Sequence, residues 1–238
     1  MNINEGCGST HGEEISRLVK ETGAHIGISH DGDADRLVLC DEQGEIVDGD
    51  EILAMTALDA LRRGTLAGKT LVATVMSNLA LDHAIREAGG QVVRTAVGDR
   101  YVLERMLADD LNVGGEQSGH MIFRDFATTG DGIVSALQVL RIMMDTDKPL
   151  SDLRKVFTKF PQIVINMKVK SRPAWEALPE VMALVKGAEK TLGDDGRVLL
   201  RYSGTEPKAR LLIEGHDEKQ IETLANGIAA KVREKIGA

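Results

Sequence analysis

The chain has 238 residues, of which 42% are hydrophobic and 28% are charged, and its 29 basic and 37 acidic side chains give a net charge of −8. This composition is typical of a globular protein, and the length fits one or two domains or several small ones. No apolar run approaches the roughly 20 residues that a membrane span needs, and the N-terminus lacks a basic segment followed by an apolar core. The acidic balance and the lack of a basic surface with aromatic side chains argue against nucleic acid. We therefore predict neither a membrane nor a nucleic-acid partner.

The two cysteines, Cys7 and Cys40, cannot form a disulfide framework, so we predict a reducing, cytoplasmic location. Aromatic residues are scarce, with 4 Phe, 2 Tyr and 1 Trp, so aliphatic side chains must fill the core. A phosphorylated substrate is compatible with the negative net charge, because local basic pockets occur on acidic proteins.

The first fifty residues predict a short helix followed by three strands. Thr10 and Glu13 form a candidate capping box for a helix that ends near Gly23. The apolar stripe of this helix is formed by Ile15, Leu18 and Val19. Strands are expected at residues 25–29 and 37–40, and at 45–48 after a turn at 41–44. An unpaired strand edge in this part is predicted to be an association site, which allows a homo-oligomer.

From residue 50 to about residue 150, predicted helices and strands alternate. Helices are expected at 52–62, 79–88 and 100–108, and strands at 70–76, 91–97 and 111–114. A further helix is predicted because Ile133, Leu137, Leu140 and Met144 lie at i, i+4, i+7 and i+11 on one helical face. This alternation is typical of a parallel, doubly wound α/β layer.

The last third of the chain has a different pattern. A half-buried strand is expected at 163–169, a helix at 175–192 and two strands at 197–202 and 209–214. A final helix follows Asp217, which forms a second candidate capping box with Gln220. This β-α-β-β-α order predicts a small antiparallel sheet with helices on one side. The border between the two parts is expected within residues 145–160.

The acidic loop at residues 31–36 is the strongest chemical feature of the sequence. Asp31, Asp33 and Asp35 repel one another unless a cation lies between them. Their all-oxygen ligands suit Mg²⁺. A solvated acidic turn and a calcium loop of the EF-hand type, with Glu42 as its last ligand, are the alternatives. The calcium loop is disfavoured because Arg36 occupies its glycine position and the flanking residues predict strands. We therefore predict a Mg²⁺ site.

The glycine-rich stretch at residues 114–120 is a candidate sugar site. Glycines at a strand end allow a ligand to approach the backbone closely. Glu116, Ser118 and His120 offer acceptors and donors that suit sugar hydroxyls, and His120 could carry a proton near neutral pH. A glycine-rich turn with a surface histidine is an equally compatible interpretation.

The turn between the last two predicted strands is a candidate phosphate site. Its hydroxyls, backbone N–H groups and guanidinium groups suit phosphate oxygens. They belong to Arg201, Ser203, Gly204, Thr205 and Arg210. An exposed hairpin with incidental charge is the alternative, and we favour phosphate binding because donors outnumber acceptors.

Residues 97–101 are a fourth candidate site, where Asp99 is either a helix N-cap or a substrate ligand. The sequence contains no Gly-x-Gly-x-x-Gly and no Walker-type loop, so a dinucleotide or nucleoside triphosphate site is unsupported.

Together, the motifs at 31–36, 115–120 and 201–206 resemble, in this order, those of the α-D-phosphohexomutase superfamily. Gln117 and residues 128–133 are similar to its phosphoglucosamine mutase branch. The resemblance implies a doubly wound, mixed-sheet α/β domain of the phosphohexomutase type plus a small β-α-β-β-α C-terminal α+β domain. In a four-domain family, it further implies that residues 1–48 are the remainder of domain 2, 49–150 are domain 3, and 151–238 are domain 4.

The resemblance also implies an activity. Such enzymes interconvert glucosamine 6-phosphate and glucosamine 1-phosphate through a phosphoserine and a bisphosphorylated sugar, in amino-sugar metabolism that supplies cell-wall precursors. The implied roles are Mg²⁺ binding by Asp31, Asp33 and Asp35, catalysis by Arg36 and His120, sugar binding by Glu116 and Ser118, and phosphate binding by Arg201, Ser203, Gly204, Thr205 and Arg210.

The Ser-His-Asn segment that carries the nucleophile of the family does not occur in this sequence. We therefore expect a C-terminal fragment that lacks the phosphoserine domain, is inactive alone, binds Mg²⁺ weakly and has the missing N-terminal domain of the same protein as a partner. The alternatives are a phosphomannomutase/phosphoglucomutase and a non-enzymatic phosphosugar- or calcium-binding module.

Overall fold

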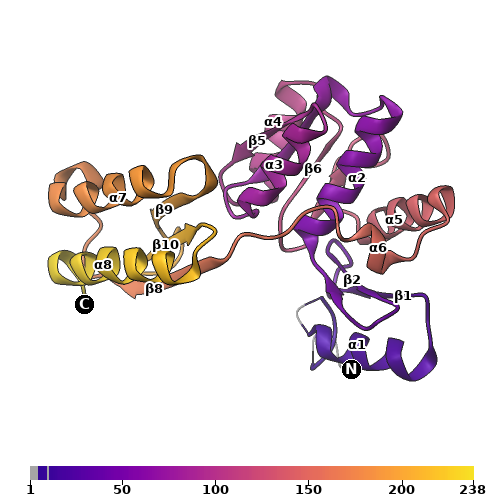
Figure 1. Ribbon diagram of the computed structural model, residues 1–238, viewed down its shortest axis with the longest axis horizontal. Coiled ribbons are helices and arrows are strands. Elements are labelled where there is room, and N and C mark those ends of the chain that lie inside the picture. The colour runs from indigo at the N-terminus through magenta and orange to yellow at the C-terminus, as the bar shows by residue number, and fades with distance from the viewer. Residues whose placement is uncertain (1–4, 10) are drawn as a thin grey trace. The chain divides into compact units, whose positions relative to one another are not determined.

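The computed structural model describes residues 5–9 and 11–238. It divides into two compact units, Met1–Thr158 and Lys159–Ala238, each of which is described by itself. Figure 1 shows the elements of both units. The predicted α/β class is confirmed, with helices and strands alternating along most of the chain.

The first unit begins with a helix on a three-stranded antiparallel sheet. Helix α1 (Gly12–Thr22) precedes β1 (Ile26–His30), β2 (Leu37–Asp41) and β3 (Ile46–Val47), in the order β1-β2-β3. Helix α1 packs closely on β1 because Gly27 has no side chain; a Cβ there would lie 2.6 Å from Ile15 and 2.7 Å from Val19. The predicted capping residue Thr10 lies outside the described residues, and the N-cap His11 makes no side-chain capping bond. Among the strands that the structure describes, β1 lies at an edge of this sheet.

A second sheet follows in the same unit, in the order β5-β4-β6-β7. Its strands are β4 (Thr70–Thr74), β5 (Gln91–Thr95), β6 (Val113–Gly115) and β7 (Met121–Phe123). Strand β4 is parallel to β5 and β6, as expected, whereas β7 is antiparallel to β6 and makes the sheet mixed. Because three strands are parallel, their carboxyl ends meet at one edge of the sheet.

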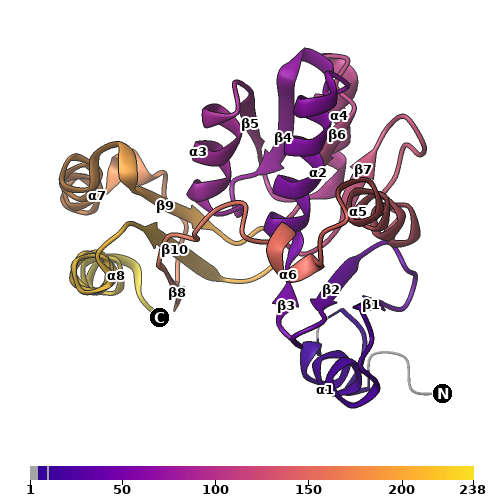
Figure 2. The ribbon, with the colours of Figure 1, turned by 45° about the vertical axis from the view of Figure 1, so that its right-hand side comes forward.

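Helices cover both faces of this sheet. They are α2 (Gly49–Arg63), α3 (Leu79–Glu87), α4 (Asp99–Ala108), α5 (Gly132–Thr146) and the short α6 (Leu150–Leu153). The two glycines of β6 lie against helices on opposite faces of the sheet. A Cβ at Gly114 would contact Val102 of α4, and a Cβ at Gly115 would contact Leu53 of α2. The turned view in Figure 2 shows α2 and α4 beside these strands. The doubly wound architecture is therefore confirmed.

Helix α5 forms where the spacing predicts it, but the face that carries the predicted stripe points outward. Ile133, Leu137 and Met144 are 59%, 56% and 83% exposed, and the fourth member of the stripe, Leu140, is half-buried. The opposite face, which includes Ala136 and Val139, is the buried one. The spacing of apolar residues therefore predicted the position of the helix but not the face that packs against the rest of the unit.

The second unit is a three-stranded antiparallel sheet with two helices. Strands β8 (Gln162–Lys168), β9 (Arg197–Tyr202) and β10 (Lys208–Glu214) have the order β8-β10-β9. Helix α7 (Pro179–Leu192) starts later than predicted, because residues 175–177 form a short 3₁₀ helix and Pro179 occupies the first α-helical turn. Helix α8 (Glu218–Ile236) is capped by Asp217, which accepts hydrogen bonds from the N–H groups of Lys219 and Gln220. The predicted β-α-β-β-α unit is confirmed.

Candidate functional site

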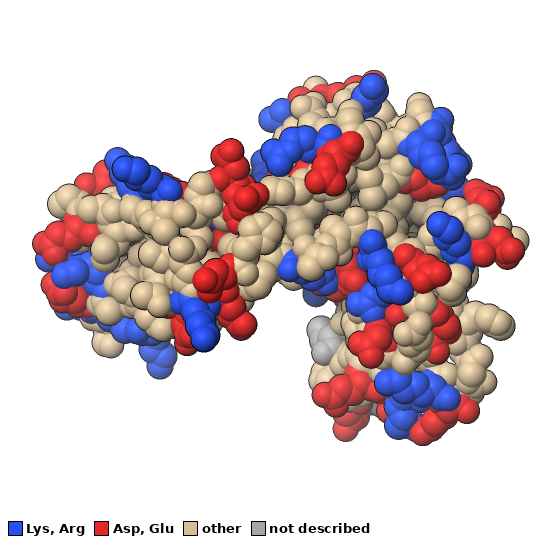
Figure 3. Space-filling model, viewed as in Figure 1, with Lys and Arg blue, Asp and Glu red and all other residues tan. Residues whose placement is uncertain are grey.

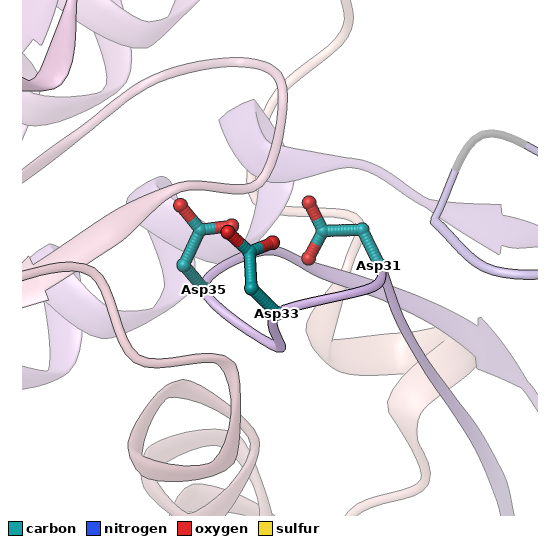
Figure 4. Close-up of side chains that lie close together, drawn as sticks. All are labelled: Asp31, Asp33 and Asp35. Atoms are coloured by element: carbon teal, nitrogen blue, oxygen red, sulfur yellow. The ribbon is translucent and has the colours of Figure 1, made fainter. Parts of the chain in front are cut away.

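The acidic loop connects β1 to β2. His30 pairs with Leu37 in the hairpin, so residues 31–36 form the connection. Each of Asp31, Asp33 and Asp35 offers an oxygen, and these oxygens lie within 4.8 Å of one another. Figure 4 shows the three carboxylate groups gathered on one side of the loop. The convergence expected from the alternating spacing is therefore present.

The electrostatics of this loop favour a bound cation. Burial raises the pKa of Asp35, and the neighbouring carboxylates of Asp31 and Asp33 raise it further, against a lowering effect of His120. The Oδ1 atom of Asp35 is buried and has no hydrogen-bond partner among the described residues. Arg36 offsets part of the charge, since its Nε lies 3.6 Å from Asp31 Oδ2. These oxygen donors fit Mg²⁺, a hard cation.

The calcium-loop alternative has no support in the structure. Its last ligand would be Glu42, but Glu42 Oε2 accepts a hydrogen bond from the N–H of Ser151 at 3.3 Å. The acidic loop is flanked by β1 and β2, whereas an EF-hand loop is flanked by helices.

The free energy of unfolding of the metal-free chain is expected to depend on pH through Asp35. Because the pKa of Asp35 is raised in the folded chain, the folded chain binds this proton more readily than the unfolded chain does. The contribution of Asp35 to stability therefore falls as pH rises through the raised pKa, and is regained as pH falls toward the ordinary value of about 3.9. Urea unfolding in EDTA at several pH values should show this in the difference between the parent chain and Asp35→Asn. A difference that does not change between about pH 4 and pH 7 would contradict it.

The glycine-rich loop lies at the carboxyl edge of the mixed sheet, directly against the acidic loop. It leaves β6 at Gly115 and returns into β7. The N–H of Leu37 donates to the carbonyl of Gly119 at 3.0 Å, and Arg36 forms an isolated β-bridge with His120. Gly119 is required here, because its φ is +91° and a Cβ would lie 2.1 Å from the carbonyl oxygen of Leu37.

Glu116 joins this loop to the neighbouring loop after β5. Its Oε1 accepts a hydrogen bond from the N–H of Gly98 at 3.0 Å, which fixes the carboxylate. Ser118 is exposed, and with Gln117 and Arg36 it lines a cavity of about 580 Å³. Three predicted site residues, Arg36, Glu116 and Ser118, thus lie in one region of the first unit.

His120 is buried between the two loops and is not the surface histidine of the alternative interpretation. It is 5% exposed, and its Nε2 lies 3.4 Å from Asp35 Oδ2. Its ring packs on Gly130, where a Cβ would lie 2.2 Å from Nε2. Its Nδ1 has no hydrogen-bond partner among the described residues.

The turn before α5 completes this region, although its residues were not predicted to belong to the site. The N–H of Gly132 donates to the carbonyl of Ala34 at 2.9 Å. The ring of His30 lies against Gly132, and its Nδ1 is 3.0 Å from the carbonyl of Arg36. The Gly130-Asp131-Gly132 sequence was a visible signal, because glycines allow rings and backbone to approach closely.

Asp99 does not cap helix α4. The N-cap is Gly98, which makes no side-chain capping bond, and Asp99 is the first residue of the helix. The N-cap interpretation was therefore wrong, and the substrate-ligand interpretation stays a prediction.

The predicted phosphate residues lie together in the second unit. Arg201 and Arg210 face each other in the β9–β10 register. Burial lowers the pKa of Arg201, and the charge of Arg210 lowers it further. Like charges directly opposite each other destabilise a sheet unless an anion offsets them. Glu206 offsets one of them, because its Oε2 accepts a hydrogen bond from Arg210 at 3.0 Å.

The turn beyond these arginines is tightly held on one side and open on the other. Ser203 is buried, and its N–H donates to the carbonyl of Lys208 at 2.8 Å. Gly204 and Thr205 are exposed. Tyr202 stacks on Trp175 with a centroid distance of 4.2 Å, which braces the start of the turn. Exposed donors on a braced turn suit an anion.

Figure 3 shows acidic and basic side chains interspersed over the visible face. Among the described residues, no helix combines the length and the apolarity needed to span a bilayer.

The chain matches two family descriptions that together cover most of its length. Residues 48–160 match "Phosphoglucomutase/phosphomannomutase, alpha/beta/alpha domain III", and residues 164–231 match "Phosphoglucomutase/phosphomannomutase, C-terminal domain". The chain belongs to this family, the phosphohexomutases.

Among individual proteins, the chain is similar to enzymes named phosphoglucosamine mutase. It is 56% identical to that of Syntrophotalea carbinolica over 236 residues, which are 99% of this chain and 52% of the relative. It is 54% identical to that of Geobacter sp. strain M21, with the same coverage. The chain thus spans about half the length of the curated relatives it matches.

Solved structures of lower identity share the fold. The chain has a TM-score of 0.75 and 21% identity to Aspergillus fumigatus N-acetylphosphoglucosamine mutase in complex with GlcNAc-6P and magnesium, covering 96% of this chain and 57% of that one. A Burkholderia thailandensis phosphoglucomutase/phosphomannomutase family protein gives 0.76 and 21%, covering 97% and 53%.

Proposed function

We propose that the chain supplies the metal-, sugar- and phosphate-binding parts of a phosphoglucosamine mutase, which interconverts glucosamine 6-phosphate and glucosamine 1-phosphate. The proposal rests mainly on the contact between the acidic loop and the glycine-rich loop. There the N–H of Leu37 donates to the carbonyl of Gly119, and His120 Nε2 lies close to Asp35 Oδ2. The names of the relatives at 56% and 54% identity support the amino-sugar substrate.

Asp31, Asp33 and Asp35 would hold Mg²⁺, which when bound offsets the negative charge of a phosphoryl group during transfer. The fit rests on their converging oxygens. Arg36 would steady the same loop, because its backbone N–H donates to Asp31 Oδ1 at 3.2 Å. Magnesium is also named in the Aspergillus structure, which supports the choice of cation.

Glu116 and Ser118 would bind sugar hydroxyls. The hydrogen bond from Gly98 fixes the Glu116 carboxylate before a ligand arrives, which lowers the entropy cost of binding. His120 would hold or move a proton at its Nε2, or orient Asp35, because it lies buried beside that carboxylate.

The turn of the second unit would bind the phosphate that does not react. Ser203, Gly204 and Thr205 would offer hydroxyl and backbone donors, and Arg201 and Arg210 would contribute charge. The opposed arginines support this role, because an anion between them would relieve their repulsion.

The phosphoryl group would come from a serine that these 238 residues do not contain, since they include no Ser-His-Asn segment. A domain carrying that serine is the proposed partner, and residues 1–48, 49–150 and 151–238 are proposed as parts of domains 2, 3 and 4. A cytoplasmic location fits a sequence with two cysteines that cannot form a disulfide framework, of which Cys40 is buried. A homo-oligomer through the β1 edge stays a prediction.

A binding and turnover assay tests the proposed function. The purified chain is expected to bind glucosamine 6-phosphate, seen as amide NMR shifts at residues 115–119 and 203–205, and to show no interconversion. Glucose 6-phosphate and mannose 6-phosphate are expected to bind more weakly. Robust turnover by the chain alone would contradict the proposal. Equal binding of all three sugars would favour a phosphomannomutase/phosphoglucomutase. If no NMR shifts occurred in either loop, neither enzyme activity would be supported.

A further inference from the structure

The first unit contains a second cavity, of about 430 Å³, whose lining includes no residue of the acidic loop or of the glycine-rich loop. The cavity and the glycine-rich loop lie at opposite ends of strand β6. Val113 at the start of the strand lines the cavity, and Gly115 at its end begins the loop. The cavity therefore lies at the amino-terminal edge of the parallel strands, opposite the candidate site. Its volume is in the range of about 300–1,000 Å³ that small-molecule sites occupy.

Two arginines in the wall of this cavity share one carboxylate. Arg63 Nε lies 3.1 Å from Asp59 Oδ2, and Arg141 Nη2 lies 2.7 Å from the same oxygen. Arg62 contacts the other oxygen of Asp59 at 2.7 Å. Arg141 has a second partner, Asp145, at 2.9 Å. Asp59 is thus shared by three guanidinium groups, and Arg63 has no other carboxylate among the described ion pairs.

The remainder of the cavity combines an acidic group with an apolar rim. Asp125 also lines it, and its Oδ2 accepts a hydrogen bond from Asn112 at 2.8 Å. Phe126 and Leu137 line it while being 65% and 56% exposed. Large apolar side chains left uncovered beside polar groups are typical of binding surfaces.

We propose that this cavity binds a small organic monoanion, a carboxylate attached to an apolar body. The carboxylate would be held by Arg63 and Arg141 through charge-assisted hydrogen bonds, and the apolar body would cover Phe126 and Leu137. A single negative charge is specified because Asp125 would repel a second one. The site is independent of the proposed mutase chemistry, which takes place at the opposite edge of the sheet.

Titration of the chain with benzoate, followed by amide NMR, tests this site. Saturable shifts are expected at Asn112 and Gln138, with no shifts at residues 115–120 or 203–205. Arg63→Gln is expected to weaken binding about fivefold or more. Arg62→Gln is the matched control, because it removes the same charge from the same carboxylate but does not line the cavity; less than about a twofold change is expected. Asp125→Asn is expected to tighten binding about twofold.

Three results would overturn the assignment. They are the absence of saturable shifts at the cavity, an equal loss of affinity in Arg62→Gln and Arg63→Gln, and weaker binding by Asp125→Asn. Each is independent of glucosamine phosphate binding, so a failure here leaves the proposed function unaffected.

Discussion

Replacing Arg154 by methionine is expected to lower the free energy of unfolding of the first unit by about 3–5 kcal/mol. Arg154 Nε lies 2.9 Å from Glu51 Oε1, and its Nη1 lies 3.3 Å from Asp41 Oδ2. Its Nη2 also donates to the carbonyl of Ile46 at 2.8 Å. Glu51 and Asp41 are buried, at 6% and 1% exposure. Removing the guanidinium leaves two buried carboxylates without this cation, and it also loosens α6 from the three-stranded sheet.

Arg105→Met is the matched control for this substitution. Arg105 pairs with Asp109 at 2.7 Å, but the two side chains are 47% and 37% exposed, so water replaces the pair and less than about 1 kcal/mol is expected to be lost. Urea unfolding monitored by circular dichroism measures both variants. If both variants lost the same free energy of unfolding, the buried ion pairs of Arg154 would stabilise the unit no more than an exposed pair does.

Replacing Asp33 by asparagine is expected to weaken Mg²⁺ binding by about tenfold or more, because ligand charge sets the affinity of carboxylate sites. Asp33 is the exposed member of the three aspartates, so the change removes a negative charge without opening the core. Calorimetric titration with MgCl₂ measures the affinity of the parent chain and of the variant. The parent affinity is itself expected to be weak, because the chain supplies only part of the proposed site.

Asp152→Asn is the control for Asp33→Asn. Asp152 is also exposed, at 58% of its side chain, and it pairs with Lys155 at 3.3 Å rather than with other carboxylates. Its replacement should leave Mg²⁺ binding unchanged. If Asp33→Asn behaved like this control, the acidic loop would be a solvated turn, and the proposed metal role would be wrong.

The fold was predictable from the sequence wherever an element is long enough to show a period. Strand β4 and helix α8 have the expected type, and β4 ends two residues earlier than predicted. Strand β7 and helix α6 were missed, because with 3 and 4 residues they are too short for a periodic signal. The similarly short β3 and β6 were predicted because a turn at 41–44 precedes one and a glycine-rich stretch follows the other. Helix α5 was predicted at the right place, but three of the four residues of its predicted stripe, Ile133, Leu137 and Met144, are exposed, and Leu140 is half-buried. Apolar spacing defines a face of a helix but does not show what packs against it.

The candidate site was predictable in its parts but not in its assembly. The chemistry of Asp31, Asp33 and Asp35 follows from residue type and spacing alone. The contact of His120 with Asp35 does not, because no local pattern indicates pairs so far apart in the chain. The burial of His120 also depends on Gly130, whose importance appears only when the ring is placed against it.

Paramagnetic relaxation by Mn²⁺, used in place of Mg²⁺, tests most directly that the acidic loop and the glycine-rich loop form one metal-centred site. Substoichiometric Mn²⁺ should broaden the amide NMR signals of residues 31–36 together with those of 119–120 and 130–132, which surround the three carboxylates. Excess Mg²⁺ should reverse the broadening, and the Asp33→Asn chain should require more Mn²⁺ to show it. Sharp signals at residues 31–36 while other acidic regions broaden would contradict this account.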